Sequence, residues 1–149
     1  MLGDGFDRGA CEDLVRRLDL GDRVRFHGAV PHAQALEAYH DADVFFFPSY
    51  REPGGNVVFE AMGASIPLIV SDRGGPGYVV DDRCGIRVTP REPEQYARDL
   101  AVAVRRLASD PGRRLEMGRA AHSRLAEVGL WSAKLDAIDR LYDQVATAG

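Results

Sequence analysis

Segments with strand-like patterns alternate with segments with helix-like patterns along most of the chain, and this order constrains the fold more than any other feature. Some segments repeat apolar residues at helical spacing, whereas others are short apolar runs that end at proline, glycine or a polar residue. Such alternation with short connections requires parallel strands joined by right-handed helical crossovers. The sequence therefore predicts an α/β fold with a doubly wound, Rossmann-like parallel sheet.

The individual elements follow from the same patterns. The apolar run Asp43–Phe47 stops at Pro48 and is typical of a strand that is covered on both faces. In a helix predicted over Pro31–His40, we expect Leu36 and Tyr39 to be buried. The segment from residue 72 to residue 83 is expected to be a loop. The other predicted strands are Arg23–His27, Pro67–Ser71 and Cys84–Val88, and the other helices of this region are Asp13–Leu20 and Asn56–Gly63.

The final third of the chain is predicted to be helical. Three amphipathic segments follow one another, at Pro93–Ser109, Pro111–Val128 and Ser132–Ala146, and proline opens the first two, where its missing N–H does least harm. No repeat, low-complexity tract or linker interrupts the chain, so residues 1–149 are predicted to form one domain. An apolar stripe on the last helix is expected to belong to the core; its members are Trp131, Leu135, Ile138, Leu141 and Tyr142.

Composition excludes several functional classes. The 149 residues include 45% hydrophobic and 28% charged residues, as in an ordinary globular protein. A net charge of −4 argues against nucleic-acid binding, which usually requires a basic face. The histidines and cysteines have no metal-ligand spacing, so we expect no metal site. Cys11 and Cys84 are expected to be reduced thiols, and no signal peptide or membrane-length apolar run occurs, which together indicate a cytoplasmic protein.

The segment from residue 48 to residue 62 carries the residues that are best suited to chemistry. Gly54 and Gly55 allow the backbone to approach a ligand closely. Asn56 and Val57 follow at a predicted helix start, where free N–H groups and the helix dipole favour an anion such as a diphosphate. Glu60 interrupts an otherwise apolar helix, and its two oxygens could accept hydrogen bonds from adjacent hydroxyls of a ribose.

Each of these features also has a purely structural interpretation. A glutamate near a helix start is favoured by the dipole alone, and a glycine pair can be an ordinary turn. A capping box is a poorer explanation, because with Asn56 as N-cap the reciprocal position is Phe59 and not Glu60. The features together, at fixed spacing after a buried strand, favour a ligand-binding site.

The same segment resembles the E-x7-E signature of retaining glycosyltransferases of the GT4 family, which have the GT-B fold. Glu52 and Glu60 stand in the two glutamate positions of that signature. The resemblance extends over nearly the whole chain, with further matching landmarks in the same order. The matching residues are Val24–Gly28, Ala42–Val44, Pro48, Ser49, Gly55–Val57, Ala61, Met62, Pro67–Asp72, Gly74, Gly75 and Gly85–Val88.

The resemblance implies roles for particular residues. Glu60 would bind the ribose hydroxyls of a nucleoside diphosphate sugar, and Glu52 would contact hydroxyls of the donor sugar as the residue nearest to catalysis. The backbone amides of Gly55, Asn56 and Val57 would hold the distal phosphate or the sugar. The same donor site would include Gly54, Ser49, and the loop with Gly28 and Ala29, which would lie along the base.

The chain departs from the family pattern at several positions. The family often has phenylalanine at position 54 and glycine at position 65, and it usually has glutamate at position 78, where this chain has Gly54, Ser65 and Tyr78. The chain opens with the apparent end of a strand, Met1–Gly5, so we expect upstream sequence to be missing. The missing parts would be the first strand, a cationic loop that neutralises the diphosphate, and an acceptor-binding N-terminal domain.

These expectations define a function. The resemblance implies the donor-binding half of an enzyme that transfers a sugar from a UDP- or GDP-sugar to an acceptor, with retained anomeric configuration and without a metal. We expect the isolated chain to lack useful turnover. The stripe on the last helix could promote self-association without the N-terminal domain, and the full enzyme could associate peripherally with a membrane. A nucleotide-sugar epimerase of the same fold and a non-catalytic binding or assembly module remain alternatives.

Overall fold

The computed structural model describes residues 1–147, which form two compact units, Met1–His40 and a second unit that begins at Asp41. The first unit contains helices α1 (Arg8–Arg17) and α2 (His32–His40). Helix α2 confirms the prediction, whereas α1 begins earlier in the sequence than predicted. Tyr39 is buried as expected, but the expectation for Leu36 was wrong, because this side chain is 38% exposed.

The predicted strand at Arg23–His27 does not form a regular strand. Its end makes one parallel bridge, in which Leu2 pairs with Gly28. The His27 N–H donates to the Met1 carbonyl at 2.9 Å, and the Gly3 N–H donates to the Gly28 carbonyl at 2.8 Å. A strand needs a hydrogen-bonding neighbour along its length, and among the described residues it is the first three of the chain that lie beside this segment as a strand would. The extended segment is therefore present without a regular ladder.

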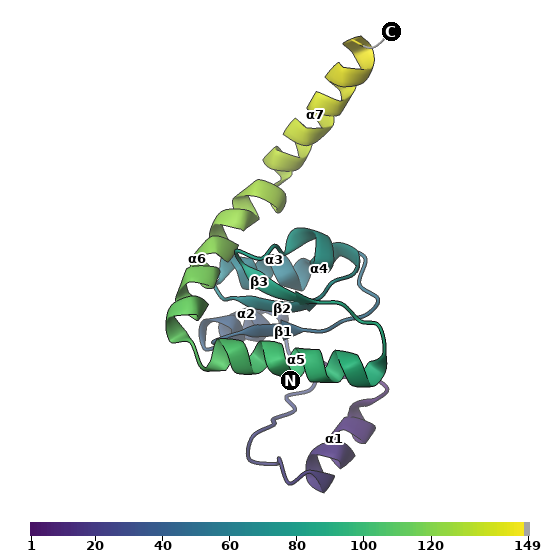
Figure 1. The fold of residues 1–149 in the computed structure, drawn as a ribbon, viewed down its shortest axis with the longest axis vertical. Helices are drawn as coiled ribbons and strands as arrows, with labels where there is room; N and C mark the ends of the chain where they lie inside the picture. The colour runs from purple at the N-terminus through teal and green to yellow at the C-terminus, as the bar shows by residue number, and fades with distance from the viewer. Residues whose placement is uncertain (148–149) are drawn as a thin grey trace. The chain divides into compact units, whose positions relative to one another are not determined.

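The second unit is built on a three-stranded parallel sheet (Figure 1). Its strands are β1 (Phe45–Phe47), β2 (Leu68–Ser71) and β3 (Gly85–Val88), in the order β1-β2-β3. All three strands were predicted, and their parallel pairing confirms the α/β prediction. The helices of this unit are α3 (Asn56–Gly63), α4 (Gly74–Val79), α5 (Pro93–Ala108), α6 (Pro111–Val128) and α7 (Trp131–Thr147).

Both faces of the central strand are covered. All four side chains of β2 are buried, which explains why its first three residues are apolar. On one face, Ile69 packs in a cluster with residues of β3, α5 and α6, including Val88, Leu100 and Leu107. Helices α3 and α4 also contact β2. Figure 1 shows α5 crossing in front of the sheet and α3 and α4 behind it. This layering fixes the loops that join each strand to its following helix.

Three predictions for this unit were wrong. The segment from 72 to 83 is not all loop, because α4 forms within it. Strand β1 is not covered on both faces, since Phe46 is 45% exposed; β1 is an edge strand and lacks a neighbour on one side in the described residues. The stripe on α7 is not core: its helix has no buried residue, and Trp131 is 76% exposed.

An ion-pair network ties the turn before β3 to α6. Arg83 contacts the carboxylates of Asp81 at 2.8 Å and Glu127 at 3.1 Å, and Arg124 also contacts Glu127 at 2.8 Å. Burial raises the pKa of the Asp81 carboxyl, but hydrogen bonds and the charge of Arg83 outweigh burial, so the pKa is lowered overall. The network therefore holds the sheet edge against the helix that precedes α7.

Candidate functional site

Two loops meet at the carboxyl end of the sheet. The first runs from residue 48 to residue 55 and joins β1 to α3, and the second contains Asp72 and Arg73 and joins β2 to α4. Because β1 and β2 are parallel, both loops leave the same edge of the sheet. Ligands of open α/β sheets bind outside this edge, so the predicted segment lies where the fold places functional loops.

Gly55 sets the direction of helix α3. Its φ of 72° and ψ of 48° lie in the left-handed region, which glycine adopts without steric cost. The Val58 N–H donates to the Gly55 carbonyl at 2.8 Å and starts the helix. Gly55 is therefore the N-cap, and the helix predicted over Asn56–Gly63 is confirmed. Asn56 is the first helical residue, with an exposed side chain.

Glu52 folds back onto this loop. One oxygen of its carboxylate, Oε1, accepts hydrogen bonds from the Gly55 N–H at 2.8 Å and the Gly54 N–H at 3.2 Å. A negative group thus lies at the amino end of α3, where the helix dipole favours an anion. A phosphate that bound the Gly55 N–H would have to displace the Glu52 carboxylate from it.

The two loops contact each other through their backbones. The Gly75 N–H donates to the Glu52 carbonyl at 3.1 Å. A Cβ atom on Gly75 would lie 2.5 Å from the Gly54 carbonyl oxygen and 2.6 Å from that of Pro53. Both distances are too short for a carbon atom beside an oxygen, so any residue other than glycine would force the backbone to shift. A Cβ atom on Gly55 would lie 3.1 Å from Cγ of Pro76. The second loop therefore supports the first, and glycine is required at this contact.

Sequence reasoning did not assign a role to a side-chain pair on the same loops. Nη1 of Arg73 donates to the Tyr50 hydroxyl at 3.0 Å, and its guanidinium carbon lies 4.7 Å from the centre of the Tyr50 ring. This pair places a positive charge on the rim next to Glu52. The signal for this pair in the sequence is an arginine two residues after a buried strand, followed by Gly74.

The remaining predicted residues have the following places. Glu60 lies in the second turn of α3 and is half-buried beside the buried Ala61. Val57 and Ser49 are also half-buried, the first in α3 and the second in the loop after β1.

Gly28 and Ala29 belong to the first compact unit and not to the loops described above. Gly28 has a φ of 71° and is buried, and a Cβ atom there would lie 2.8 Å from Nη1 of Arg8.

Within residues 1–147, no three histidine, cysteine, aspartate or glutamate side chains gather as a metal site would require. In the same range, no helix has the length and apolar character that a membrane span would need.

Known proteins share both this sequence and this architecture. Residues 1–124 match the family described as glycosyl transferases group 1. Glycogen synthase of Mycobacterium tuberculosis is 33% identical over 143 residues, which are 95% of this chain and 34% of that protein. The D-inositol 3-phosphate glycosyltransferase of Streptomyces avermitilis is 37% identical over 132 residues, 88% of this chain and 27% of that protein.

A solved structure agrees with these relatives. Sucrose-phosphate synthase from Thermosynechococcus elongatus superposes with a TM-score of 0.77 and 34% identity, over 97% of this chain and 36% of that one. The chain thus spans about a third of the length of the proteins that it matches, and its architecture is that of a GT-B glycosyltransferase domain. The match over most of its length shows that the chain belongs to the group 1 family of glycosyltransferases.

Proposed function

We propose that this chain is the donor-binding part of a retaining glycosyltransferase of the GT4 type, which takes a sugar from a UDP- or GDP-sugar. The observation that carries the proposal is the pair of backbone-locked loops at the carboxyl end of β1 and β2, with a carboxylate already seated on the amides at the start of α3. A site that holds one anion by main-chain N–H groups is suited to a diphosphate. Relatives named as glycosyltransferases support the same class of reaction.

Specific residues would perform this binding. Glu60 would accept hydrogen bonds from the ribose hydroxyls, and Glu52 would contact the donor sugar after leaving the Gly55 amide. The amides of Gly55, Asn56 and Val57 would face the distal phosphate. The loop with Gly28 and Ala29 would lie along the base, and Ser49 and Gly54 would complete the donor site.

The reaction would develop negative charge on the departing diphosphate. Donors that are already oriented toward that charge stabilise the transition state. A helix start contributes about 0.3–1 kcal/mol when exposed and up to ~2 kcal/mol when partly buried, whereas enzymatic acceleration requires about 8 kcal/mol or more. We therefore propose that cations and an acceptor domain outside this chain supply most of the effect, without a metal, and that the chain alone binds donor weakly and has no useful turnover.

A titration tests the proposal. UDP, GDP, UDP-glucose and GDP-mannose are titrated into the 149-residue chain by NMR, together with Glu60→Ala and the control Glu116→Ala, whose carboxylate lies on the exposed side of α6. Loss of a hydrogen bond to a charged group is expected to weaken nucleotide binding about 10- to 100-fold in Glu60→Ala. Thermal unfolding verifies that each variant is folded.

Three outcomes would count against the proposal. The first is an absence of saturable binding by any of the four nucleotides, and the second is equal affinity in Glu60→Ala and the unsubstituted chain. Rapid sugar transfer by the purified chain would contradict the proposed lack of turnover, although the donor-binding role would stand.

A further inference from the structure

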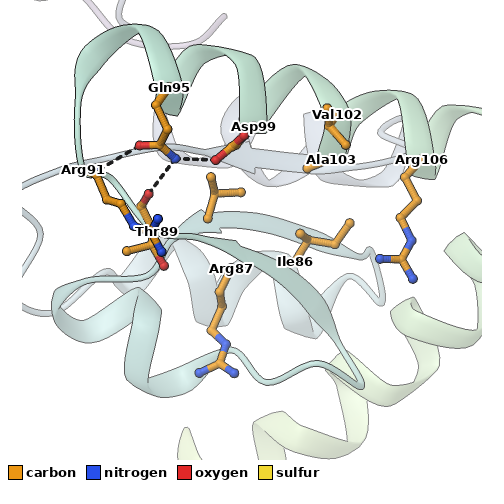
Figure 2. A pocket seen from close by; sticks show the side chains of 10 residues that line it. Ile86, Arg87, Thr89, Arg91, Gln95, Asp99, Val102, Ala103 and Arg106 are labelled. Atoms are coloured by element: carbon orange, nitrogen blue, oxygen red, sulfur yellow. Dashed lines mark hydrogen bonds between the residues drawn. The ribbon is translucent and has the colours of Figure 1, made fainter.

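A groove runs along the open side of β3, and one of its lining residues contacts the second loop of the candidate donor site, since the Thr89 hydroxyl donates to the Asp72 carboxylate at 3.2 Å. Strand β3 forms one wall and helix α5 forms the other, around a cavity of about 310 Å³ (Figure 2). Ile86, Val88, Val102 and Ala103 form its apolar part. Val102 is 56% exposed. The groove therefore offers apolar surface that nothing in the described residues covers.

The backbone of β3 is open toward this groove. The sheet order is β1-β2-β3, so β3 has a paired side and an unpaired side within residues 1–147. The Leu68 N–H donates to the Cys84 carbonyl, and the Asp72 N–H donates to the Val88 carbonyl. Alternate residues of a parallel strand direct both backbone groups to the same side. The N–H and the carbonyl of Arg87 therefore face away from β2, as an exposed sheet edge does.

The two ends of the groove are basic. Arg91 lies at one end, before α5 begins, and Arg106 lies at the other end, in the last turn of α5 (Figure 2). Neither guanidinium has an acidic partner among the residues that the structure describes, whereas Arg87 pairs with Asp82 at 3.1 Å. The acidic residue of the lining, Asp99, accepts a hydrogen bond from the side chain of Gln95.

The spacing of these charges matches a short strand. From Gln95, next to Arg91, to Arg106 the helix rises about 17 Å. An extended chain covers that distance in about five residues. A segment paired with Arg87 would therefore reach both arginines with side chains near its two ends.

We propose that this groove binds an extended polypeptide segment with an acidic residue near each end, which pairs with β3 as a fourth parallel or antiparallel strand. Its main chain bonds with the open edge at Arg87, its apolar side chains pack on Ile86 and Val102, and its carboxylates meet Arg91 and Arg106. This is strand addition to a sheet edge, in which backbone bonds give affinity and side-chain pockets give specificity. A nucleic acid would use the two charges but neither the apolar wall nor the open strand edge.

The probe for this proposal is a synthetic peptide of sequence Glu-Val-Thr-Val-Thr-Glu, capped at both ends. It is titrated into the isotope-labelled 149-residue chain, and backbone amide shifts are followed by NMR. Three comparison ligands are the same peptide with lysine at both ends, the acidic peptide with alternate N-methyl groups, and a six-residue oligothymidylate. Saturable binding at millimolar concentration or below, with shifts centred on Arg87 and its neighbours, is the expected result.

Matched variants separate the groove from general charge. Arg91→Gln with Arg106→Gln removes both end charges, whereas Arg98→Gln with Arg105→Gln removes two charges of the same helix that do not line the groove. The first double variant is expected to bind the acidic peptide about fivefold more weakly than the unsubstituted chain. The second double variant is expected to lose less than about twofold in affinity. The lysine peptide and the N-methylated peptide are expected not to bind.

The proposal fails if the acidic peptide gives no saturable shifts, or if both double variants weaken it equally. Equal binding of the N-methylated peptide would show that the strand edge is not used. Tighter binding of the oligothymidylate at the same residues would identify a phosphate-binding surface instead of a strand acceptor.

Discussion

Ser65 carries the main backbone strain of the second unit. It follows the carboxyl end of α3 with a φ of 60°, in the left-handed region that favours glycine, and α6 lies against its carbonyl oxygen through Gly118. For a residue with a Cβ atom, this conformation costs about 1–2 kcal/mol. We expect Ser65→Gly to raise the free energy of unfolding by about 1 kcal/mol, since the exposed serine side chain contributes little. Urea unfolding measures the change.

The matched control for Ser65 is its neighbour. Ala64 has a φ of −78°, which any residue adopts, so Ala64→Gly is expected to lower the free energy of unfolding by about 0.5–1 kcal/mol through added flexibility of the unfolded chain. If both glycine variants lost stability, the strain assigned to Ser65 would be absent.

Glu52 gives a second prediction at this scale, because its carboxylate occupies the Gly55 N–H. Glu52→Gln keeps an oxygen on that amide but removes the negative charge that a diphosphate would face. Neutral acceptors bind more weakly than charged ones, so the amide is released more easily. We expect Glu52→Gln to bind UDP about two- to fivefold more tightly than the unsubstituted chain. Calorimetry measures the affinity, with Glu94→Gln as the control; weaker binding by a folded Glu52→Gln would contradict this competition.

At the scale of elements, the contact between the two loops should determine whether the candidate site forms. Gly75→Ala would place a methyl group 2.5 Å from the Gly54 carbonyl oxygen, so the loops must separate. We expect it to lower the free energy of unfolding by about 1–3 kcal/mol and to abolish UDP binding. Gly54→Ala is the control, since a Cβ atom there meets nothing within 4 Å and should leave stability nearly unchanged. Equal unfolding midpoints for the two variants would refute the proposed contact.

The elements also show what could be predicted from the sequence. Helix α3 and strand β2 were predicted because their patterns are local: a buried apolar run for β2 and a glycine pair before α3. Helix α4 was missed because glycine and proline supply two thirds of Gly74–Val79, and its packing on β2 overrides their low propensity. The strand predicted at Arg23–His27 did not form a regular strand, because pairing depends on a neighbouring strand that the local sequence does not reveal.

The candidate site also has a part that could be predicted from the sequence and a part that could not. Its residue types and spacing were visible in the sequence, whereas the hydrogen bond from the Gly55 N–H to Glu52 and the close contact of Gly75 with Gly54 arise only after folding. The residues that make such contacts do not recur at helix or strand spacing, so the sequence gives no periodic signal for them. The residues could therefore be named from the sequence, but their mutual support could not.

At the scale of the whole molecule, α7 presents an exposed apolar surface. Trp131, Leu135, Ile138 and Tyr142 repeat at intervals of four, three and four residues and lie on one side of the helix. Their exposed fractions run from 45% to 76%. A continuous apolar stripe of this kind marks an interaction surface. In a solution of the chain alone, another copy of α7 is the surface available to cover it, and four-three spacing suits pairing of two helices.

We therefore expect the purified chain to self-associate through α7 as its concentration rises. Leu135→Lys with Ile138→Lys should keep it monomeric, whereas Ala137→Lys with Gln144→Lys adds the same charge off the stripe and should not. Sedimentation velocity measures the assembly. Trp131 is the single tryptophan of the chain and 76% exposed, so its emission should shift to shorter wavelength on association. A sedimentation coefficient that is independent of concentration, or equal behaviour of the two lysine pairs, would show that α7 does not mediate self-association.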